Sequence, residues 1–343
     1  MGTRRTSVKQ LFGPVHFGSD QEPGIRRRGA KRFTYIDERT KRAPSALDLE
    51  RIRVLAVPPA WSDVWIAADI GSHLQAVGRD ARGRKQYRYH PAFTESQSEN
   101  KFDDLVSFAQ ALGSLRSRVT RDLGRDDLSH DRVVATVVRL LDVTSLRVGN
   151  VEYAHANRSF GLTTLRNRHV AVRGTVIRFT FRGKSAHDFD VVVDNARLAK
   201  IVRSCQHLPG QQLFECTAED ATVRAIGSSD VNTYLGEHGA PGMTAKTFRT
   251  WNATVRAAEG LADIAVLEEA PTKRVVSAVI DQVADHLGNT RSICRNSYVH
   301  PAVVDAYLDG SLMKHWRRPV GRRPTGLLDS ERRTLRLLRS RPF

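Results

Sequence analysis

The chain has 343 residues, of which 40% are hydrophobic, so it can bury a sizeable core and form two domains. Its 54 Lys and Arg against 37 Asp and Glu give a formal net charge of +17 at pH 7. Such a basic chain favours a polyanion, and we expect nucleic acid rather than an anionic membrane as its partner. The cysteines number three, an odd count, and show no CxxC spacing, so neither a disulfide framework nor a zinc site is suggested. This cysteine usage indicates a reducing, intracellular compartment. Every apolar run is too short to cross a bilayer, so no membrane span is predicted.

Residues 1–92 predict a small β-rich domain. Its first 32 residues are rich in Arg, Lys and Gly, with RRRGAKR at 26–32, and we expect them to form a solvated arm. Ser45, with Asp48 three residues later, predicts a helix that begins with a capping box. Short runs of alternating apolar and polar residues predict strands at 33–38, 63–69, 73–80 and 84–90.

Residues 93–343 predict a larger, mainly helical domain, so the predicted fold class is α+β. The polar run TESQSEN at 94–100 is the predicted linker between the two domains. Apolar residues then recur every three or four positions from Phe102 to Leu141, as on the buried faces of two helices. A small three-stranded antiparallel sheet with tight Gly turns is predicted at 169–174, 175–183 and 187–194. Helices are expected from there to the end, where the Arg-rich run 317–343 predicts a basic surface helix.

Tyr298 stands in RNSYVHP, directly before a His-Pro pair, where a packed aromatic residue is the ordinary interpretation. Upstream, LGNT at 287–290 predicts a helix that ends at Gly288, followed by Asn289 nine residues before the tyrosine. A phenol can attack a phosphodiester as a nucleophile, and an amide can donate a hydrogen bond to the developing charge. The two residues are therefore candidates for the centre of a catalytic site.

Three basic residues complete the candidate catalytic set. Arg147, in TSLRVGN, follows an apolar helix, and Lys184, in FRGKSAHDF, stands at the tip of the predicted hairpin. Arg249, in KTFRTWNATVRAA, lies one helical turn after Lys246 on the same face. Taken singly, they read as a structural loop arginine, an exposed hairpin lysine and part of a solvated stripe. A planar guanidinium nevertheless suits a phosphate, because it donates two parallel hydrogen bonds.

The last predicted strand of the N-terminal domain contains KQYRYH at 85–90. Alternation places Tyr87 and Tyr89 on one face of the strand and Gln86 and Arg88 on the other. Aromatic residues on one face of a sheet are most often core residues. Contact of these side chains with DNA is the alternative interpretation.

The order of these motifs behind a β-rich domain resembles the bacterial, poxvirus-like branch of the type IB DNA topoisomerases, from about Arg32 to Leu308. The LGN…Y ending is similar to the LGH…Y ending that this family shares with the tyrosine recombinases. KxxR stands where recombinases usually carry HxxR, and KQYRYH resembles the QYxY segment that poxvirus-type enzymes press into the major groove. Two positions depart from the poxvirus pattern. Asn289 replaces His, as it often does in bacterial members, and Ser185 follows Lys184 where an acidic residue is usual.

The resemblance implies an enzyme whose two domains form a clamp around duplex DNA. It implies relaxation of supercoils by transient cleavage of one strand through a 3′-phosphotyrosyl intermediate, strand rotation and religation, without nucleotide, metal or other cofactor. A monomer in the cytoplasm, associated with the nucleoid, is expected. Lys184 is implied to protonate the leaving 5′ hydroxyl. The implied catalytic residues are Tyr298, Arg147, Lys184, Arg249 and Asn289, and the implied DNA contacts are Gln86, Tyr87, Tyr89 and Lys246.

Two other functions stay open at the level of sequence. A tyrosine site-specific recombinase uses the same chemistry, but the β-rich N-terminal region and KxxR argue against it. A non-catalytic basic DNA-binding protein accounts for the charge and the aromatic residues, but it gives no reason for the tyrosine and the ordered cations. The sequence contains neither a GxxxxGK[ST] loop nor an acidic cluster typical of catalytic Mg²⁺ sites.

Overall fold

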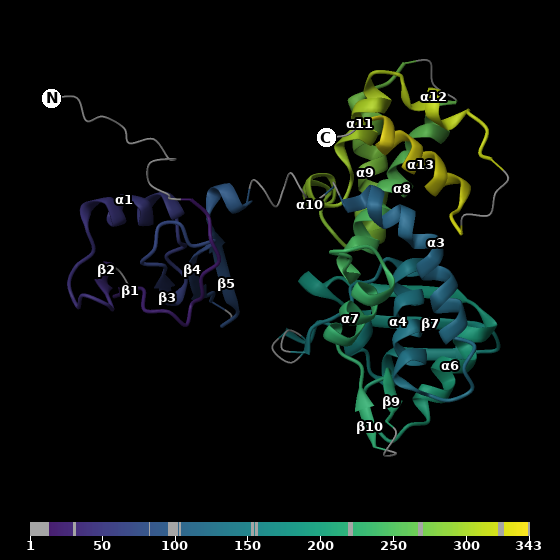
Figure 1. Ribbon diagram of the computed structural model, residues 1–343, viewed down its shortest axis with the longest axis horizontal. Coiled ribbons are helices and arrows are strands. Elements are labelled where there is room, and N and C mark those ends of the chain that lie inside the picture. Colours follow the sequence, from purple (N-terminus) through teal and green to yellow (C-terminus); the bar gives the residue numbers. More distant parts are fainter. Residues whose placement is uncertain are drawn as a thin grey trace. The chain divides into compact units, whose positions relative to one another are not determined.

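The computed structural model describes residues 14–29, 32–81, 83–94, 102, 104–151, 154, 157–218, 222–266, 270–321 and 326–341. The chain divides into two compact units, residues 1–101 and 102–343 (Figure 1). The linker predicted at 94–100 lies outside the described residues except for Thr94, and so do the first 13 residues of the predicted arm.

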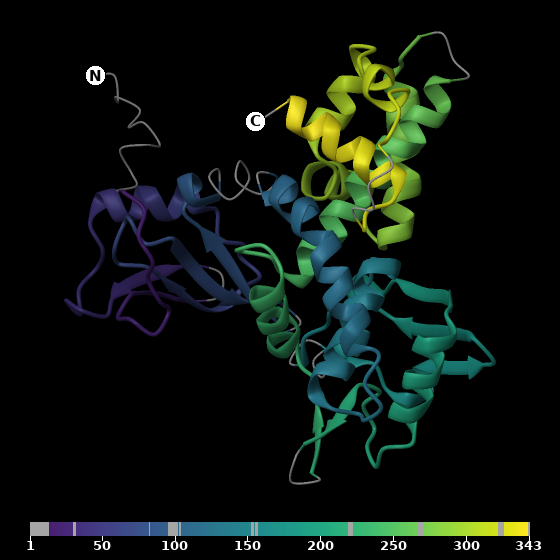
Figure 2. The same ribbon diagram turned by 45° about the vertical axis from the view of Figure 1, so that its right-hand side comes forward.

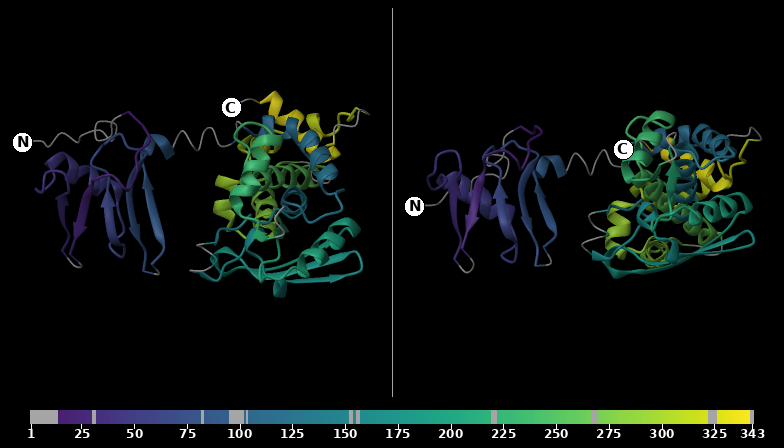
Figure 3. Two further views of the ribbon diagram at one scale, coloured as in Figure 1. Left: turned by 60° about the horizontal axis from the view of Figure 1, so that its bottom comes forward. Right: turned by 90° about the horizontal axis from the view of Figure 1, so that it is seen from below.

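The N-terminal unit is built on a five-stranded antiparallel sheet, whose strands lie side by side in Figure 3. Its strands run in the order β2-β1-β3-β4-β5. They are β1 (Ile25–Arg28), β2 (Thr34–Asp37), β3 (Ser62–Ile66), β4 (Leu74–Arg79) and β5 (Lys85–Tyr89). Helix α1 (Ala46–Leu55) packs Ile52 and Leu55 into one core cluster with Ile25, Val64 and Ile66. The helix begins as predicted, because Ser45 accepts a hydrogen bond from the backbone N–H of Asp48 (3.1 Å).

The arginine run at 26–28 corrects the prediction of a solvated arm, because it forms strand β1 between β2 and β3. Ile25 is buried and anchors the strand. Arg26 pairs with Glu38 (2.9 Å), and Arg27 donates to the carbonyl of Pro58 (3.1 Å). The prediction was wrong because one apolar residue is too little periodicity to indicate a strand, while neighbouring acceptors satisfy the arginines.

The second unit is mainly helical and surrounds a single hydrophobic core, with α8 at its centre. A three-stranded antiparallel sheet, in the order β6-β7-β8, lies against α6 (Figure 2). The predicted α+β fold class, with a β-rich N-terminal part and a small sheet in a helical region, is confirmed. The helices are α3 (Asp104–Asp122), α4 (His130–Thr144), α6 (Ala196–Gln206), α7 (Ser228–His238), α8 (Ala245–Ala265), α9 (Lys273–Leu287), α10 (Arg291–Ser297), α11 (Pro301–Leu308), α12 (Leu312–Trp316) and α13 (Asp329–Ser340). The sheet strands are β6 (Val170–Arg173), β7 (Val176–Arg182) and β8 (Asp188–Asp194).

Two predictions for the second half of the chain need correction. The region after the sheet is not helical throughout, because β9 (Glu215–Thr217) pairs with β10 (Val223–Ala225). Strands of three residues are too short to carry a recognisable period. The Arg-rich end is not a helix lying only on the surface, since α13 buries one whole face in the core. Within the described ranges, no helix combines the length and apolarity needed to cross a bilayer.

Candidate active site

The loop that carries Arg147 leaves the end of α4 through a tight turn. Ser145 caps the helix in the left-handed conformation (φ 58°), so the chain changes direction there. The next residue, Leu146, is buried in the core. Backbone pairing with a second segment then fixes the loop. The Leu162 N–H donates to the Arg147 carbonyl (2.9 Å), and the Thr163 N–H donates to the Val148 carbonyl (2.7 Å). Arg147 therefore projects from a rigidly held backbone.

Arg147 meets Asn289, which lies 142 residues further along the chain. The guanidinium donates to Asn289 Oδ1 (2.6 Å) and, more weakly, to the Gly288 carbonyl (3.4 Å). Because Oδ1 accepts from Arg147, the other amide atom, Nδ2, is left to donate elsewhere. Nδ2 is buried and has no acceptor within the described part of the chain. Gly288 caps α9 in the left-handed conformation (φ 61°), as the sequence predicted.

The hairpin of β7 and β8 packs directly against this turn. A Cβ atom on Gly288 would lie 2.5 Å from Phe189 Cζ and 2.7 Å from His187 Cδ2, so only glycine fits between the hairpin and the end of α9. At the hairpin tip, Ser185 (φ 63°) and Ala186 (φ 61°) turn the chain. Lys184 is exposed there and forms no hydrogen bond or ion pair with any other described residue. The structure thus brings the hairpin, although not the lysine ammonium itself, into contact with the Asn289 turn.

Arg249 joins the Arg147 loop to the end of α9 from inside the core. It is 3% exposed, and it donates to the carbonyls of Ser145 and Leu287, the latter at 2.8 Å. Burial and the charge of Arg147 lower the pKa of Arg249 to about 10, whereas the Tyr298 hydroxyl acts in the opposite direction. The guanidinium is still protonated at neutral pH. The neighbouring positive charges of Arg147 and Arg249 favour the binding of an anion.

Tyr298 lies directly against Arg249. It caps the short helix α10, and the Arg249 Cζ atom is 5.2 Å from the centre of its ring. The Tyr298 carbonyl accepts a hydrogen bond from Thr254 Oγ1 (3.1 Å), on the same helix as Arg249. The backbone of the candidate nucleophile is therefore fixed to the element that carries the cation.

Several supporting residues were not predicted from the sequence. Asn252 donates to the Asp142 carbonyl (2.8 Å) and to Ser145 Oγ (3.0 Å), and so ties α8 to the end of α4. It follows Arg249 by three residues on α8, and a polar residue at that helical spacing was the available signal. The imidazole of His286 is half-buried beside the site. Burial, followed by the charges of Arg256 and Arg249, lowers the pKa of His286 to about 4, so the ring is neutral at pH 7.

The candidate DNA-contact residues are accessible in both units. Tyr87 and Tyr89 lie on one face of β5, as predicted, with their rings stacked at 6.1 Å and 45% and 44% exposed. They are surface residues rather than core residues. Gln86, on the other face, donates to Asp80 Oδ2 (3.0 Å). Lys246 is exposed on the first turn of α8, whereas Arg249 is buried, so the two basic residues have different surroundings.

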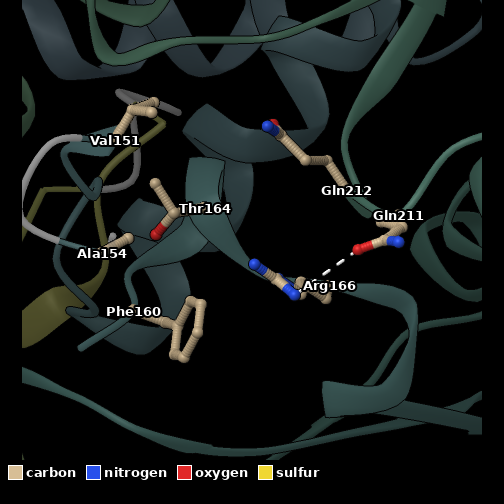
Figure 4. A pocket seen from close by; sticks show the side chains of 7 residues that line it. All are labelled: Val151, Ala154, Phe160, Thr164, Arg166, Gln211 and Gln212. Carbon is tan, nitrogen blue, oxygen red and sulfur yellow. Dashed lines mark hydrogen bonds between the residues drawn. The ribbon is translucent and has the colours of Figure 1, made fainter. Parts of the chain in front are cut away.

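Two small clefts open beside the Arg147 loop. The first has a volume of about 210 Å³ and is shown in Figure 4, where Arg166 donates to Gln211 Oε1 (3.4 Å). The second, of about 320 Å³, brings two further arginines to the same region and is lined by Ala154, Arg158, Phe160, Arg166 and Arg168. The chain segment with Phe160 and Arg166 also contains Leu162, whose N–H pairs with the Arg147 carbonyl. Arg158, Arg166 and Arg168 therefore extend the positive charge beyond the candidate site, along the segment that pairs with the Arg147 loop.

The arrangement matches a phosphodiester chemically. One guanidinium group, that of Arg249, lies against the phenol of Tyr298, and a second, that of Arg147, is hydrogen-bonded to the amide of Asn289. Such donors suit the non-bridging oxygens of a phosphate. Among the described residues, no three His, Cys, Asp or Glu side chains gather as ligands for a metal ion.

Comparison with known proteins agrees with a site that acts on a phosphodiester. Residues 90–317 match the family model of the eukaryotic DNA topoisomerase I catalytic core, and residues 32–80 match that of the bacterial DNA topoisomerase IB N-terminal domain. The chain is similar to DNA topoisomerase 1B of Acanthamoeba polyphaga mimivirus, at 28% identity over 291 residues, covering 82% of this chain and 86% of the relative. It is also similar to DNA topoisomerase 1B of vaccinia virus (strain Copenhagen), at 20% identity over 247 residues, covering 71% and 75%. A further relative is DNA topoisomerase 1 of Mycosarcoma maydis, at 25% identity over 224 residues, covering 58% of this chain and 22% of that protein. Since the catalytic-core model spans well over half of these 343 residues, the chain belongs to the type IB DNA topoisomerases and carries the N-terminal domain of their bacterial branch.

Proposed function

We propose that the protein relaxes supercoiled DNA by nicking and resealing one strand, with Tyr298 as the nucleophile. The observation that carries the proposal is the contact of Tyr298 with buried Arg249, next to the hydrogen-bonded pair of Arg147 and Asn289. A phenol needs neighbouring positive charge to attack as a phenolate, and a phosphate needs donors for the charge that builds on its oxygens.

In the proposed cleavage step, the Tyr298 hydroxyl releases its proton to solvent while its oxygen forms a bond to phosphorus, and the bond from phosphorus to the 5′ oxygen breaks. Arg147 and Arg249 bind the non-bridging oxygens, and Asn289 Nδ2 donates a further hydrogen bond. The leaving 5′ oxygen takes up a proton. Religation is the reverse reaction, so the phosphotyrosyl bond stores the energy of the broken linkage and no nucleotide is consumed.

Lys184 is the proposed general acid for the leaving oxygen. Its exposed place on a hairpin that packs against Gly288, the residue before Asn289, supports this role. Arg147 is proposed to assist it. A proton donor at this oxygen contributes roughly 10²- to 10⁴-fold to the cleavage rate.

The Lys184→Ala variant is expected to cleave ordinary DNA slowly but to cleave a substrate with sulfur in place of the bridging 5′ oxygen at nearly the parent rate. A thiolate leaves without protonation, so the acid is no longer needed. Single-turnover adduct formation on the two substrates measures the difference. Arg182→Ala, at an exposed position on the same hairpin, is the control and should respond equally to both substrates. Equal slowing of Lys184→Ala on oxygen and sulfur substrates would rule out this role.

The remaining proposed contacts hold the duplex. Exposed Tyr87 and Tyr89 present aromatic rings on one face of β5, and Gln86 presents an amide on the other. Exposed Lys246 presents a cation. We propose that the two units close around DNA as a clamp and that a monomer suffices, since one nick needs one active site. The net charge of +17 supports strong backbone binding, and it suits a location on the nucleoid in the cytoplasm. A structure of the protein on duplex DNA tests these contacts directly.

Relaxation of plasmid in EDTA is the experiment that tests the function as a whole. The purified protein is expected to convert supercoiled plasmid into a ladder of topoisomers with neither ATP nor divalent metal. The plasmid should carry no chosen recognition site, because a site-specific recombinase leaves such a substrate unchanged. A protein that only binds DNA shifts the plasmid in a gel but relaxes nothing. Failure to relax, or a strict requirement for metal or nucleotide, would contradict the proposal.

A further inference from the structure

Helix α13 lies beyond the residues that either family model matches, yet it is built into the second unit. In Figures 1 and 2 this yellow helix lies beside α8, which it contacts. Leu335, Leu337 and Leu338 are buried in the common core. Even its basic face is engaged, because Arg336 donates to the carbonyls of Arg318 and Pro319, both at 2.9 Å. The end of the chain is therefore a structural part of the catalytic unit rather than a free basic tail.

One acidic residue of α13 enters a buried network of charges. Glu331 accepts two hydrogen bonds from Arg116 on α3, at 2.7 and 2.8 Å. The same guanidinium donates to both carboxylate oxygens of Asp142 on α4, at 2.8 and 2.9 Å. The side chains of Glu331 and Asp142 are only 4% and 3% exposed, and that of Arg116 is 18% exposed. Loss of one partner in such a network leaves an uncompensated buried charge.

The network reaches the candidate catalytic residues through two short paths. Asp142 lies in the last turn of α4, three residues before Ser145, which begins the Arg147 loop, and Asn252 binds the Asp142 carbonyl. Glu331 also accepts a hydrogen bond from Trp251 Nε1 (3.3 Å) on α8. Trp251 stands two residues after Arg249. The Glu331 carboxylate thus contacts α8, which carries Arg249, and it reaches α4, which precedes the Arg147 loop, through Arg116.

We propose that α13 acts as a brace of the active site, with Glu331 and Arg116 as positioning residues for Arg147 and Arg249. The inference rests on the proposed function. Neither residue meets the substrate. Together they fix the end of α4 against α8, and so hold the two guanidinium groups at the separation that the phosphate requires. A displacement of about 1 Å at a reacting centre costs on the order of 10²-fold in rate.

The test compares Glu331→Gln and Glu331→Ala with the full-length parent. Single-turnover formation of the covalent adduct is measured at saturating DNA, and DNA affinity is measured separately. We expect the adduct rate to fall roughly 10- to 100-fold in Glu331→Ala and less in Glu331→Gln, which keeps an acceptor for Trp251 and Arg116. The affinity should change less than about threefold, because backbone contacts spread over the basic surface supply it. Asp329→Asn is the matched control, since Asp329 is 70% exposed on the same helix and should retain the parent rate.

A second comparison separates positioning from simple loss of stability. Leu338→Ala removes buried apolar packing from α13 without touching the charge network, and it should lower the melting temperature while the folded protein keeps its adduct rate. In the double variant Arg116→Met with Glu331→Met, Asp142 keeps its ion pair with Arg139 (2.7 Å), so joint removal of Arg116 and Glu331 should restore part of the melting temperature but not the rate. A parent-like rate in Glu331→Ala, or equal slowing in Leu338→Ala, would overturn the brace while leaving the proposed function intact. A parent protein that forms no adduct would overturn both.

Discussion

Replacement of Tyr298 with phenylalanine is expected to abolish adduct formation and plasmid relaxation while DNA binding persists. The variant lacks the oxygen that forms the bond to phosphorus, so the covalent path is lost, with a rate decrease on the order of 10⁴-fold or more. The fold should survive, because Thr254 holds the backbone of this residue and Arg249 still stacks on the ring. Denaturing gels detect the adduct, native gels detect binding, and plasmid gels detect relaxation.

Tyr307→Phe provides the matched control for this result. Tyr307 is a buried tyrosine of α11, and its hydroxyl has no hydrogen-bond partner among the described residues. Its removal should leave relaxation at the parent level. If Tyr298→Phe relaxes plasmid as well as Tyr307→Phe does, the nucleophile has been assigned to the wrong residue.

The second large effect is expected for Arg249→Ala, which should slow cleavage by about 10²- to 10³-fold, or about 3–4 kcal/mol of transition-state stabilisation. Arg249 is the cation in contact with Tyr298, and it also bridges the Ser145 and Leu287 carbonyls. Loss of these buried hydrogen bonds should lower the melting temperature as well. Single-turnover cleavage at saturating DNA, below the melting transition, isolates the catalytic part of the effect.

Two further variants make this prediction specific. Arg249→Lys keeps the charge but cannot donate to two carbonyls and the substrate from one planar group, so only partial recovery of the rate is expected. Arg256→Ala removes an exposed arginine from the same helix and should cleave at nearly the parent rate. A near-parent rate in Arg249→Ala would remove this residue from the mechanism.

Local signals allowed much of the fold to be predicted from the sequence. Ser45 with Asp48 marked the start of α1, and Gly288 marked the end of α9, because caps depend on residues close together in the chain. Alternation located the three strands of the small sheet. It failed for β1, whose arginines are satisfied by partners elsewhere in the domain, and for β9 and β10, which are too short to show a period.

The contacts of the candidate site were less accessible to sequence reasoning. The resemblance named the five residues, but the pairing of Arg147 with Asn289 joins positions 142 residues apart and depends on how α4 and α9 pack. The contact of Glu331 with Arg116 also joins distant positions, 215 residues apart, and the Arg-rich composition around Glu331 gave no indication that this residue is buried. Long-range packing of this kind leaves no periodic trace in the chain.

The amide at Asn289 has a consequence for the pH dependence of the candidate site. An amide neither gains nor loses a proton, the imidazole of His286 is neutral above pH 5 with a pKa of about 4, and Arg249 is still cationic with a pKa of about 10. The charges that these three groups bring to the candidate site are therefore the same at mildly acidic and at neutral pH.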